Sequence, residues 1–227
     1  MTSQIERECI ISRYSYCNES IERNDFVLVF PTPQFNRNPQ VTADSISHQW
    51  SVLRMLSGVD PTATNDDRVI IGFRHPNDEG GVDCHPGYGR HYKTPFINIP
   101  WGYLKFDEQP LEALSHELVQ VFEDVSPVSP RTDQWKEGMC DFMRLFALYA
   151  CKMHLIAEKK AECYRRAAYT PGACFYHDYA GRLLLFLEKS GGSISKTEDS
   201  RLTVLRFWEC NLDYLIPASK PGQSNAS

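Results

Sequence analysis

Hydrophobic residues along the chain follow two different spacings, and the order of these spacings predicts the architecture. Unbroken runs of β-branched and aromatic residues at 25–31 and 68–73 are typical of buried strands. A third run, at 95–101, alternates and is bracketed by prolines. Because proline cannot donate to the hydrogen-bond ladder of a sheet, this pattern favours an edge strand. The segment 75–93, rich in glycine and polar residues, is predicted to be a long loop.

Hydrophobic residues at helical spacing predict five helices, at 44–56, 110–125, 134–155, 177–189 and 199–215. Asp44 and Asp133 are the predicted N-caps of the first and third helices. Pro110 opens the second helix at a favoured first-turn position, and the prolines of 126–130 break it. Residues 158–176 show no clear spacing.

The order of the elements predicts an α+β fold in which strands and helices mix first and only helices follow. We expect one domain over residues 23–216. Within it, a mixed subdomain at about 23–125 would face an all-helical subdomain at about 126–216 across a cleft. Residues 1–22 are predicted to form an N-terminal arm, either a short helix packed against the body or a loose segment, and the polar residues 217–227 a flexible tail.

The composition is that of a folded protein and excludes several partners. Hydrophobic residues make up 42% of the 227 positions and charged residues 23%, so the chain can bury a sizeable core. The net charge is −5 and no long basic run occurs, so nucleic acid is not an expected partner. No hydrophobic stretch approaches the roughly 20 residues that cross a bilayer, so no membrane partner is expected.

The eight cysteines bear on the redox environment of the chain. They show no C-x-x-C spacing, and the N-terminal residues lack the hydrophobic segment of a secretory signal. We therefore expect free thiols and a cytoplasmic location. A signal peptide removed from the sequence would reverse both expectations.

The predicted helix that begins at Pro110 carries the candidate catalytic residues His116, Glu117 and Gln120. Residues four apart lie on one face of a helix, so His116 and Gln120 would point at the same ion. In a His-Glu-x-x-His motif, both histidines bind zinc, and the glutamate takes a proton from the zinc-bound water. Gln120 replaces the second histidine, and an amide oxygen suits Ca²⁺ or Mg²⁺ better than zinc. The candidate cofactor is therefore zinc or another divalent metal, unless the replacement has abolished metal binding.

Two carboxylates on the next predicted helix are candidates to complete this site. Glu137 would supply the third metal ligand, which must come from another element. Asp141, four residues later on the same face, would accept the free N–H of His116 and orient its ring. The alternative is that this pair of carboxylates faces solvent.

The remaining candidates are predicted to line a substrate cleft: Asn98, Trp101, His85, His91, His177 and Tyr179. The first two belong to the predicted edge strand, whose backbone could pair with an extended ligand. The two loop histidines are candidate replacement ligands or acid–base groups, and the last two residues are candidate donors to an oxyanion. Solvated loop histidines and ordinary helix packing are the alternatives.

Three segments together resemble a known family: LSHELVQVF at 114–122, WKEGMCDFMRL at 135–145 and YHDYAGRLLLFLEKSGG at 176–192. They resemble the zincin-fold (Glu-zincin) metallopeptidases and, among these, the plant basic secretory protein-like group. The resemblance covers about 25–195 and implies a zincin-like fold. It also implies that His116 and Glu137 bind zinc and that Glu117 is the general base, while the second histidine of the family falls at Gln120.

Three functions compete on these observations. The first is a metal-dependent hydrolase, in which Glu117 takes a proton from a metal-activated water. The second is a metal-free acid–base enzyme of the cyclase, isomerase or lyase type, built on the same carboxylates and His116. The third is a non-catalytic pseudoenzyme that keeps the cleft for a ligand. In each case the expected ligand is a small molecule or a peptide.

Overall fold

The structure is a computed structural model that describes residues 2–32, 34–35, 38–64, 68–77, 85–91, 93–105, 109–126 and 132–209. The chain divides into two compact units, Met1–Ser51 with Val59–Val125, and Val52–Gly58 with Ser126–Ser227. Over the described residues it forms eight α-helices, one 3-10 helix and one five-stranded mixed sheet, so the predicted α+β class is confirmed. Within this part of the chain, no helix combines the length and hydrophobicity needed to cross a membrane.

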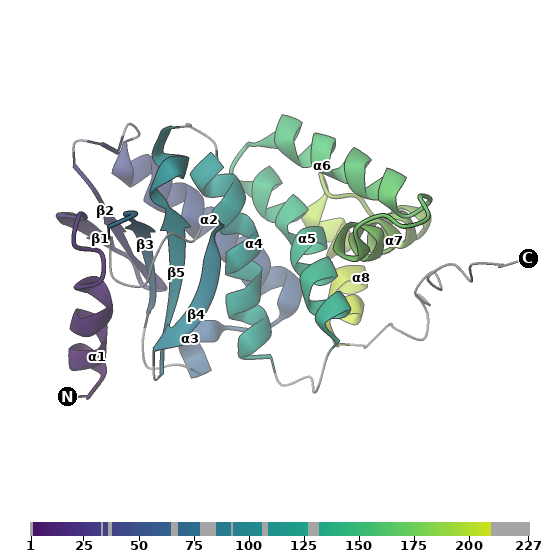
Figure 1. Ribbon diagram of the computed structural model, residues 1–227. Coiled ribbons are helices and arrows are strands. Elements are labelled where there is room, and N and C mark those ends of the chain that lie inside the picture. The colour runs from purple at the N-terminus through teal and green to yellow at the C-terminus, as the bar shows by residue number, and fades with distance from the viewer. Residues whose placement is uncertain are drawn as a thin grey trace, which may run out of the picture. The chain divides into compact units, whose positions relative to one another are not determined.

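The first unit is built on the sheet, whose strand order is β1-β2-β3-β5-β4 (Figure 1). The strands are β1 (Glu19–Glu22), β2 (Phe26–Phe30), β3 (Val69–Arg74), β4 (Gly87–His91) and β5 (Thr94–Pro100). The pairs β2–β3 and β3–β5 are parallel, whereas β1 and β4 pair antiparallel with their neighbours. Strands β2 and β3 are buried along nearly their whole length, which explains their unbroken hydrophobic runs. Both were predicted.

The prediction that the proline-bracketed run is an edge strand is wrong. β5 is an interior strand that pairs with both β3 and β4. Its prolines stand at the two ends of the strand, Pro95 opposite Arg90 and Pro100 opposite Arg74, so the middle of the ladder is left intact. The strand at this edge of the described sheet is β4, inside the segment predicted to be a loop. Its sequence GYGRH has no hydrophobic alternation, which is why the pattern did not reveal it.

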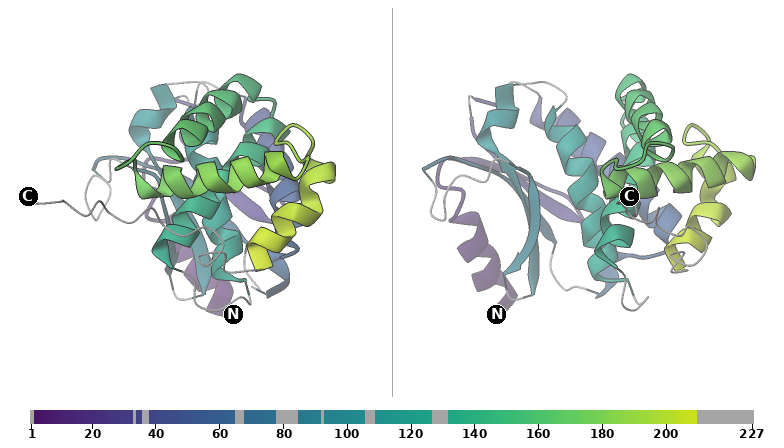
Figure 2. Two further views of the ribbon diagram at one scale, coloured as in Figure 1. Left: turned by 90° about the vertical axis from the view of Figure 1, so that its right-hand side faces the viewer. Right: turned by 45° about the vertical axis from the view of Figure 1, so that its right-hand side comes forward.

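Helices cover both faces of the sheet. Figures 1 and 2 show α1 (Thr2–Ile11) on one face, and the N-terminal part of α2 (Pro39–Ser57) with α4 (Gln109–Asp124) on the other. The face toward α1 buries a hydrophobic cluster of Ile10, Tyr14, Val27, Val29 and Ile70. The other two elements of this unit are α3 (Pro61–Thr64) and the 3-10 helix η1 (Trp101–Lys105). Residues 1–22, predicted to be an arm, thus contain a helix packed on the sheet and a strand of it.

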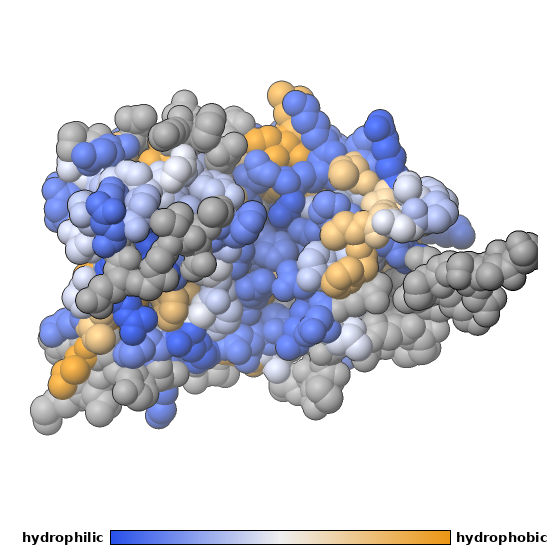
Figure 3. Space-filling model, viewed as in Figure 1, coloured by the Kyte–Doolittle hydropathy of each residue, from blue (hydrophilic) through white to orange (hydrophobic). Residues whose placement is uncertain are grey.

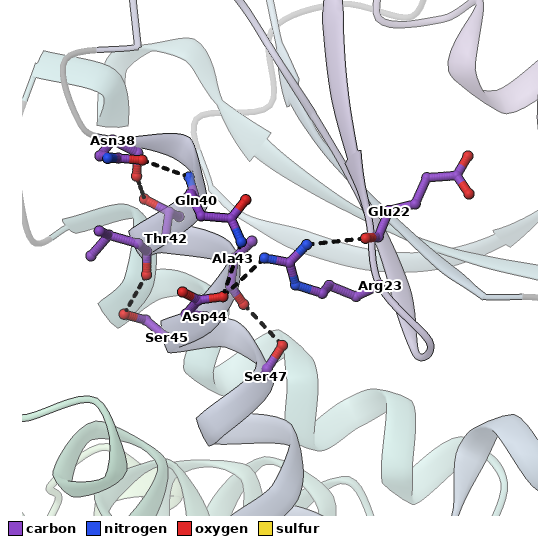
Figure 4. A network of polar contacts seen from close by, with 10 residues as sticks. Glu22, Arg23, Asn38, Gln40, Thr42, Ala43, Asp44, Ser45 and Ser47 are labelled. Carbon is purple, nitrogen blue, oxygen red and sulfur yellow. Dashed lines mark hydrogen bonds and ion pairs between the residues drawn. The ribbon is translucent and has the colours of Figure 1, made fainter.

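The start of α2 lies five residues before the predicted N-cap. Asn38 precedes the helix, and its Oδ1 accepts a hydrogen bond from the backbone N–H of Gln40 at 2.9 Å. Pro39 occupies the first helical position, where its missing N–H costs nothing. Asp44 lies inside the helix instead, where it accepts from the guanidinium of Arg23 at 2.9 Å (Figure 4). The prediction of Asp44 as cap is therefore wrong, because Asn38 and Pro39 form the helix start.

The second unit holds α5 (Asp133–Ala150), α6 (His154–Ala167), α7 (Phe175–Lys189) and α8 (Thr197–Glu209). Thr132, rather than the predicted Asp133, caps α5, and its hydroxyl accepts from the N–H of Trp135 at 3.2 Å. The predicted helix 134–155 is two helices, separated near Lys152, which has a positive φ of 64°. α5 packs against α6 and α7, and α7 also packs against α8. Residues 210–227, with the predicted tail and the predicted end of the last helix, lie outside the described residues.

Several large hydrophobic side chains are exposed on the described surface, among them Ile5 on α1 (68% exposed), Leu155 on α6 and Leu202 on α8. Figure 3 shows a mostly hydrophilic face with a few orange areas. Exposed hydrophobic side chains are common on folded proteins and do not by themselves mark a binding surface.

Candidate functional site

The helix α4 brings His116 and Gln120 together in the first unit, as their spacing predicts. The Nε2 atoms of the two side chains lie 3.4 Å apart. In this orientation the amide N–H of Gln120 faces the imidazole nitrogen, and a half-turn of the amide would present its oxygen there instead. Both side chains are partly exposed.

The opposite side of α4 fixes the helix on the body of the first unit. Its buried hydrophobic side chains include those that the helical spacing predicts, and in addition Val119: Leu111, Leu114, Leu118, Val119, Val121 and Phe122. The ring of Phe122 lies 5.0 Å from that of Trp50 on α2. Gln49, also on α2, donates a side-chain hydrogen bond to the backbone carbonyl of Leu111 on α4 at 3.4 Å. These contacts hold the His116–Gln120 pair on a rigid element.

Glu117 is a buried carboxylate beside this pair, with only 7% of its surface exposed. Its charge acts on Tyr103 of η1. Burial, and then the charges of Glu112 and Glu117, raise the pKa of the Tyr103 phenol. Tyr103 is therefore protonated at neutral pH and can donate a hydrogen bond. The first unit thus places an acceptor carboxylate and a donor phenol in one region of α4 and η1.

A cluster at the end of α4 ties the edge strand β4 to this helix. The hydroxyl of Tyr88 donates to Oδ2 of Asp124 at 2.7 Å, and the Nε of Arg90 contacts the same oxygen. The guanidinium of Arg90 also donates to the Lys93 carbonyl at 3.0 Å. Burial and the Asp124 carboxylate raise the pKa of Tyr88, so its hydroxyl remains a donor. The side chains of β4 that face α4 therefore attach the edge strand to this helix.

In the second unit, Asp141 on α5 lies close to His177 on α7. Asp141 is 5% exposed, and its Oδ2 lies 3.6 Å from Nε2 of His177. Its Oδ1 lies 3.2 Å from the guanidinium of Arg144, one turn along α5. A buried carboxylate and a partly exposed imidazole therefore lie side by side where α5 packs against α7.

Tyr164 on α6 completes the polar cluster around Asp141. Its ring lies 5.1 Å from the ring of His177, and the guanidinium of Arg144 lies 5.7 Å from its centroid. Burial is the main cause that raises the pKa of Tyr164, and the nearby Asp141 carboxylate raises it further. The cluster therefore has one carboxylate, one guanidinium, one imidazole and one neutral phenol.

Glu137 and Tyr179 occupy other positions in the second unit. Glu137 is partly exposed on α5, and its charge raises the pKa of Tyr176 on α7, after the larger effect of desolvation. Tyr179 is 1% exposed and packs over Gly138, where an added Cβ would lie 2.6 Å from the Cβ of Tyr179. Its ring is part of the close contact between α5 and α7.

The other predicted cleft residues lie at several places in the first unit. The side chain of Asn98 is on the α1 face of the sheet, away from α4, and accepts from the hydroxyl of Tyr14 at 2.7 Å. The Trp101 ring lies 4.8 Å from that of His75. His85 is exposed, and His91 contacts residues of the α1 segment. The described contacts of Asn98 and His91 are thus with the α1 segment.

The predicted metal ligands belong to different units, with His116 and Gln120 in the first and Glu137 in the second. Over the ranges that the structure describes, no three His, Cys, Asp or Glu side chains are grouped so that they could hold a metal ion. His116 and Gln120 nevertheless fit two positions of a metal site, because both can turn a donor atom to one point.

Three site residues escaped the sequence patterns. Tyr103 and Tyr164 stand in segments without a motif. Asp124, at the end of α4, has no motif partner either. Each meets its partner through packing of elements distant in sequence, which spacing along the chain does not encode.

The comparisons with known proteins add no relative. No protein-family model matches the chain, and no curated protein matches it with significance.

Proposed function

We propose that this chain is a zincin-like, metallopeptidase-type protein with an altered metal site, and that it acts as a hydrolase-type or acid–base enzyme on a small molecule or peptide. One observation carries the proposal. On α4, His116 and Gln120 converge to 3.4 Å beside the buried carboxylate of Glu117. The helix lies against a mixed sheet and beside its antiparallel edge strand, which supports the zincin-like assignment.

His116 and Gln120 are the residues of α4 that would hold a divalent metal. The first offers an imidazole nitrogen, and the second offers an amide oxygen once the amide has turned. A metal held there would lower the pKa of a bound water and polarise the bond to be cleaved. The amide is the weaker donor for zinc, so we expect weaker zinc binding than a two-histidine helix provides.

Glu117 is the residue to which we assign the proton transfer. Its carboxylate oxygen accepts a proton from the attacking water, or from carbon or oxygen of a substrate in the metal-free version. Tyr103 is the proposed donor, because η1 packs against α4 and the phenol, which is protonated at neutral pH, lies within the field of the Glu117 carboxylate. Both assignments use side chains of the first unit alone.

The substitution Glu117→Gln tests the assignment of the proton acceptor. It keeps the size of the side chain and removes its basicity. On peptide and ester substrates, we expect kcat/KM to fall by about 100-fold or more with an unchanged unfolding curve. The matched control is Glu123→Gln on the same helix, which should leave kcat/KM within about twofold. Full activity in Glu117→Gln would remove the basis of the proposal.

The substitution Gln120→His tests the metal-site origin of α4. It restores the second imidazole, and we expect zinc affinity measured by calorimetry to rise by about 100-fold or more. Gln120→Ala is the control, because it frees the His116 nitrogen without adding a ligand. If Gln120→His and Gln120→Ala bind zinc equally, α4 is not an altered metal-binding helix.

A non-catalytic binding protein is the second candidate, and one observation favours it. The amide nitrogen of Gln120 faces the nitrogen of His116 that a metal would need. In that arrangement Gln120 presents an N–H donor, and not a metal-binding oxygen, to the imidazole nitrogen. A ligand found by thermal-shift screening should then bind Glu117→Gln as tightly as the wild type, and chelators should have no effect.

A further inference from the structure

Cys9, Arg13 and His91 form a cluster in the first unit, separate from the His116–Gln120 pair. The sulfur of Cys9 lies 3.8 Å from Nε2 of His91. The guanidinium of Arg13 lies 2.9 Å from Nδ1 of the same ring. Cys9 is on α1, Arg13 follows this helix, and His91 ends β4. Two elements distant in sequence thus bring a thiol, an imidazole and a guanidinium together.

The packing of the α1 segment on the sheet fixes this cluster. Ile10, next to Cys9, is 1% exposed within the hydrophobic cluster, and the Tyr14 hydroxyl is bonded to Asn98. On β4, Gly89 lies on the same face as His91, and an added Cβ there would meet the Phe96 ring at 2.8 Å. The α1 face of β4 therefore presents His91 beside a residue without a side chain.

The hydrogen bond from Arg13 determines which nitrogen of His91 carries the proton. A guanidinium is only a donor, so Nδ1 must be the acceptor. The neutral ring then carries its proton on Nε2, the nitrogen that faces the sulfur of Cys9. His91 therefore donates its N–H to the sulfur of Cys9.

The surroundings of Cys9 are a hydrogen-bond donor and a cation. The Nε2 atom of His91 faces the sulfur, and the guanidinium of Arg13 holds the ring from its other nitrogen. An exposed sulfur beside an imidazole N–H and a positive charge is the kind of environment in which reactive cysteines are found.

We propose that Cys9 is a modification site, a reactive thiol that takes small electrophiles and is oxidised by hydroperoxides. Its side chain is exposed, so the reagents can reach it. In the oxidation, the sulfur attacks one oxygen of the peroxide, and an S–O bond forms as the O–O bond breaks. The sulfur is oxidised to a sulfenic acid, the peroxide is reduced, and the leaving hydroxide takes a proton from solvent to become water.

Cys163 and Cys174 provide references within the same chain. Both are exposed, and neither lies within hydrogen-bonding distance of a histidine in the described part of the chain. With a limiting amount of iodoacetamide near neutral pH, peptide-resolved mass spectrometry of the full chain should show Cys9 alkylated at least about fivefold faster than either reference. Equal rates at the three cysteines would overturn the proposal.

Substitutions of the two partners separate the hydrogen-bond arrangement from a general charge effect. We expect His91→Ala and Arg13→Met each to slow the alkylation of Cys9 by about threefold or more, while the reference cysteines keep their rates. Arg7→Met is the matched control, because Arg7 is on the same helix but is ion-paired with Glu22. If Arg7→Met slows Cys9 as much as Arg13→Met does, the tautomer argument is wrong.

A second measurement tests the oxidant. The full chain is treated with dilute hydrogen peroxide in the presence of dimedone, which traps sulfenic acids. We expect the adduct on the Cys9 peptide before it forms on Cys163 or Cys174, and less of it in His91→Ala. Adducts that form at the three cysteines at the same rate would refute the assignment of hydroperoxides. The outcome is independent of the function proposed for α4, because none of these residues takes part in it.

Discussion

Asp141 and Arg144 allow the polar cluster of the second unit to be tested by a stability measurement. The two side chains are only 7% and 14% exposed, and their charged atoms lie 3.2 Å apart. Removing one partner of a buried ion pair leaves the other charge without compensation, at a typical cost of about 3–5 kcal/mol. Asp141→Asn keeps the size of the side chain and one acceptor oxygen. We therefore expect it to lower the free energy of unfolding by about 2–4 kcal/mol.

A double-mutant cycle isolates the contribution of the pair. Arg144→Met should also destabilise, but the double variant should cost at least about 1 kcal/mol less than the sum of the single changes, because no charge is left unpaired. Urea unfolding followed by tryptophan fluorescence measures the four free energies, with the slope against denaturant unchanged. Asp133→Asn is the control, because Asp133 is exposed on the same helix and should change stability by about 0.5 kcal/mol or less. Additive single effects would refute the coupling.

Two further predictions follow from the packing of α6 and α7 and from the surface of the first unit. In Gly181→Ala, the new Cβ would lie 2.0 Å from the backbone oxygen of Tyr164. We therefore expect a lower Tm, although alanine favours a helix over glycine by about 1 kcal/mol. An unchanged Tm would contradict this close contact. Hydrogen bonds from Arg68, and then from Arg7, lower the pKa of Glu22 below its ordinary value of 4.5. The ionised Glu22 therefore stabilises the folded protein above pH 4.5, and this stabilisation is lost as the pH falls through the lowered pKa. The urea midpoint of Glu22→Gln should therefore fall less between about pH 6 and about pH 3 than that of the wild type, and equal slopes would argue against the ion pairs.

The sequence predicts those elements whose buried face is made of large hydrophobic residues. β2 and β3 are examples, because both faces are buried and the run of hydrophobic residues is continuous. α6 is the opposite case. Its buried residues are Ala157, Ala161, Tyr164 and Ala167, and three small side chains do not stand out as a stripe. The small residues nevertheless have a structural reason, since they let α6 approach α7 closely at Gly181.

In the candidate sites too, contacts within one helix could be predicted from the sequence, whereas contacts between elements could not. The convergence of His116 and Gln120 follows from helix geometry alone, so four-residue spacing was sufficient to predict it. The contact of Asp141 with His177 joins two helices and depends on how α5 packs against α7. No spacing along the chain encodes that packing, so the sequence did not predict the contact with His177.

Asn98 shows why polar residues on a strand are poor indicators of a cleft in this fold. A strand covered by helices on both faces has no solvent side, so alternation distinguishes the two faces without saying which one carries the site. On β5, the buried Ile97 and Ile99 lie on one face, and Asn98 with Phe96 lies on the face toward α1. The amide of Asn98 is there because the hydroxyl of Tyr14 needs a partner between helix and sheet. The polar side chain of this interior strand is thus explained by its hydrogen bond to another buried polar group. The alternation of residues along a strand does not tell whether such a side chain binds a ligand.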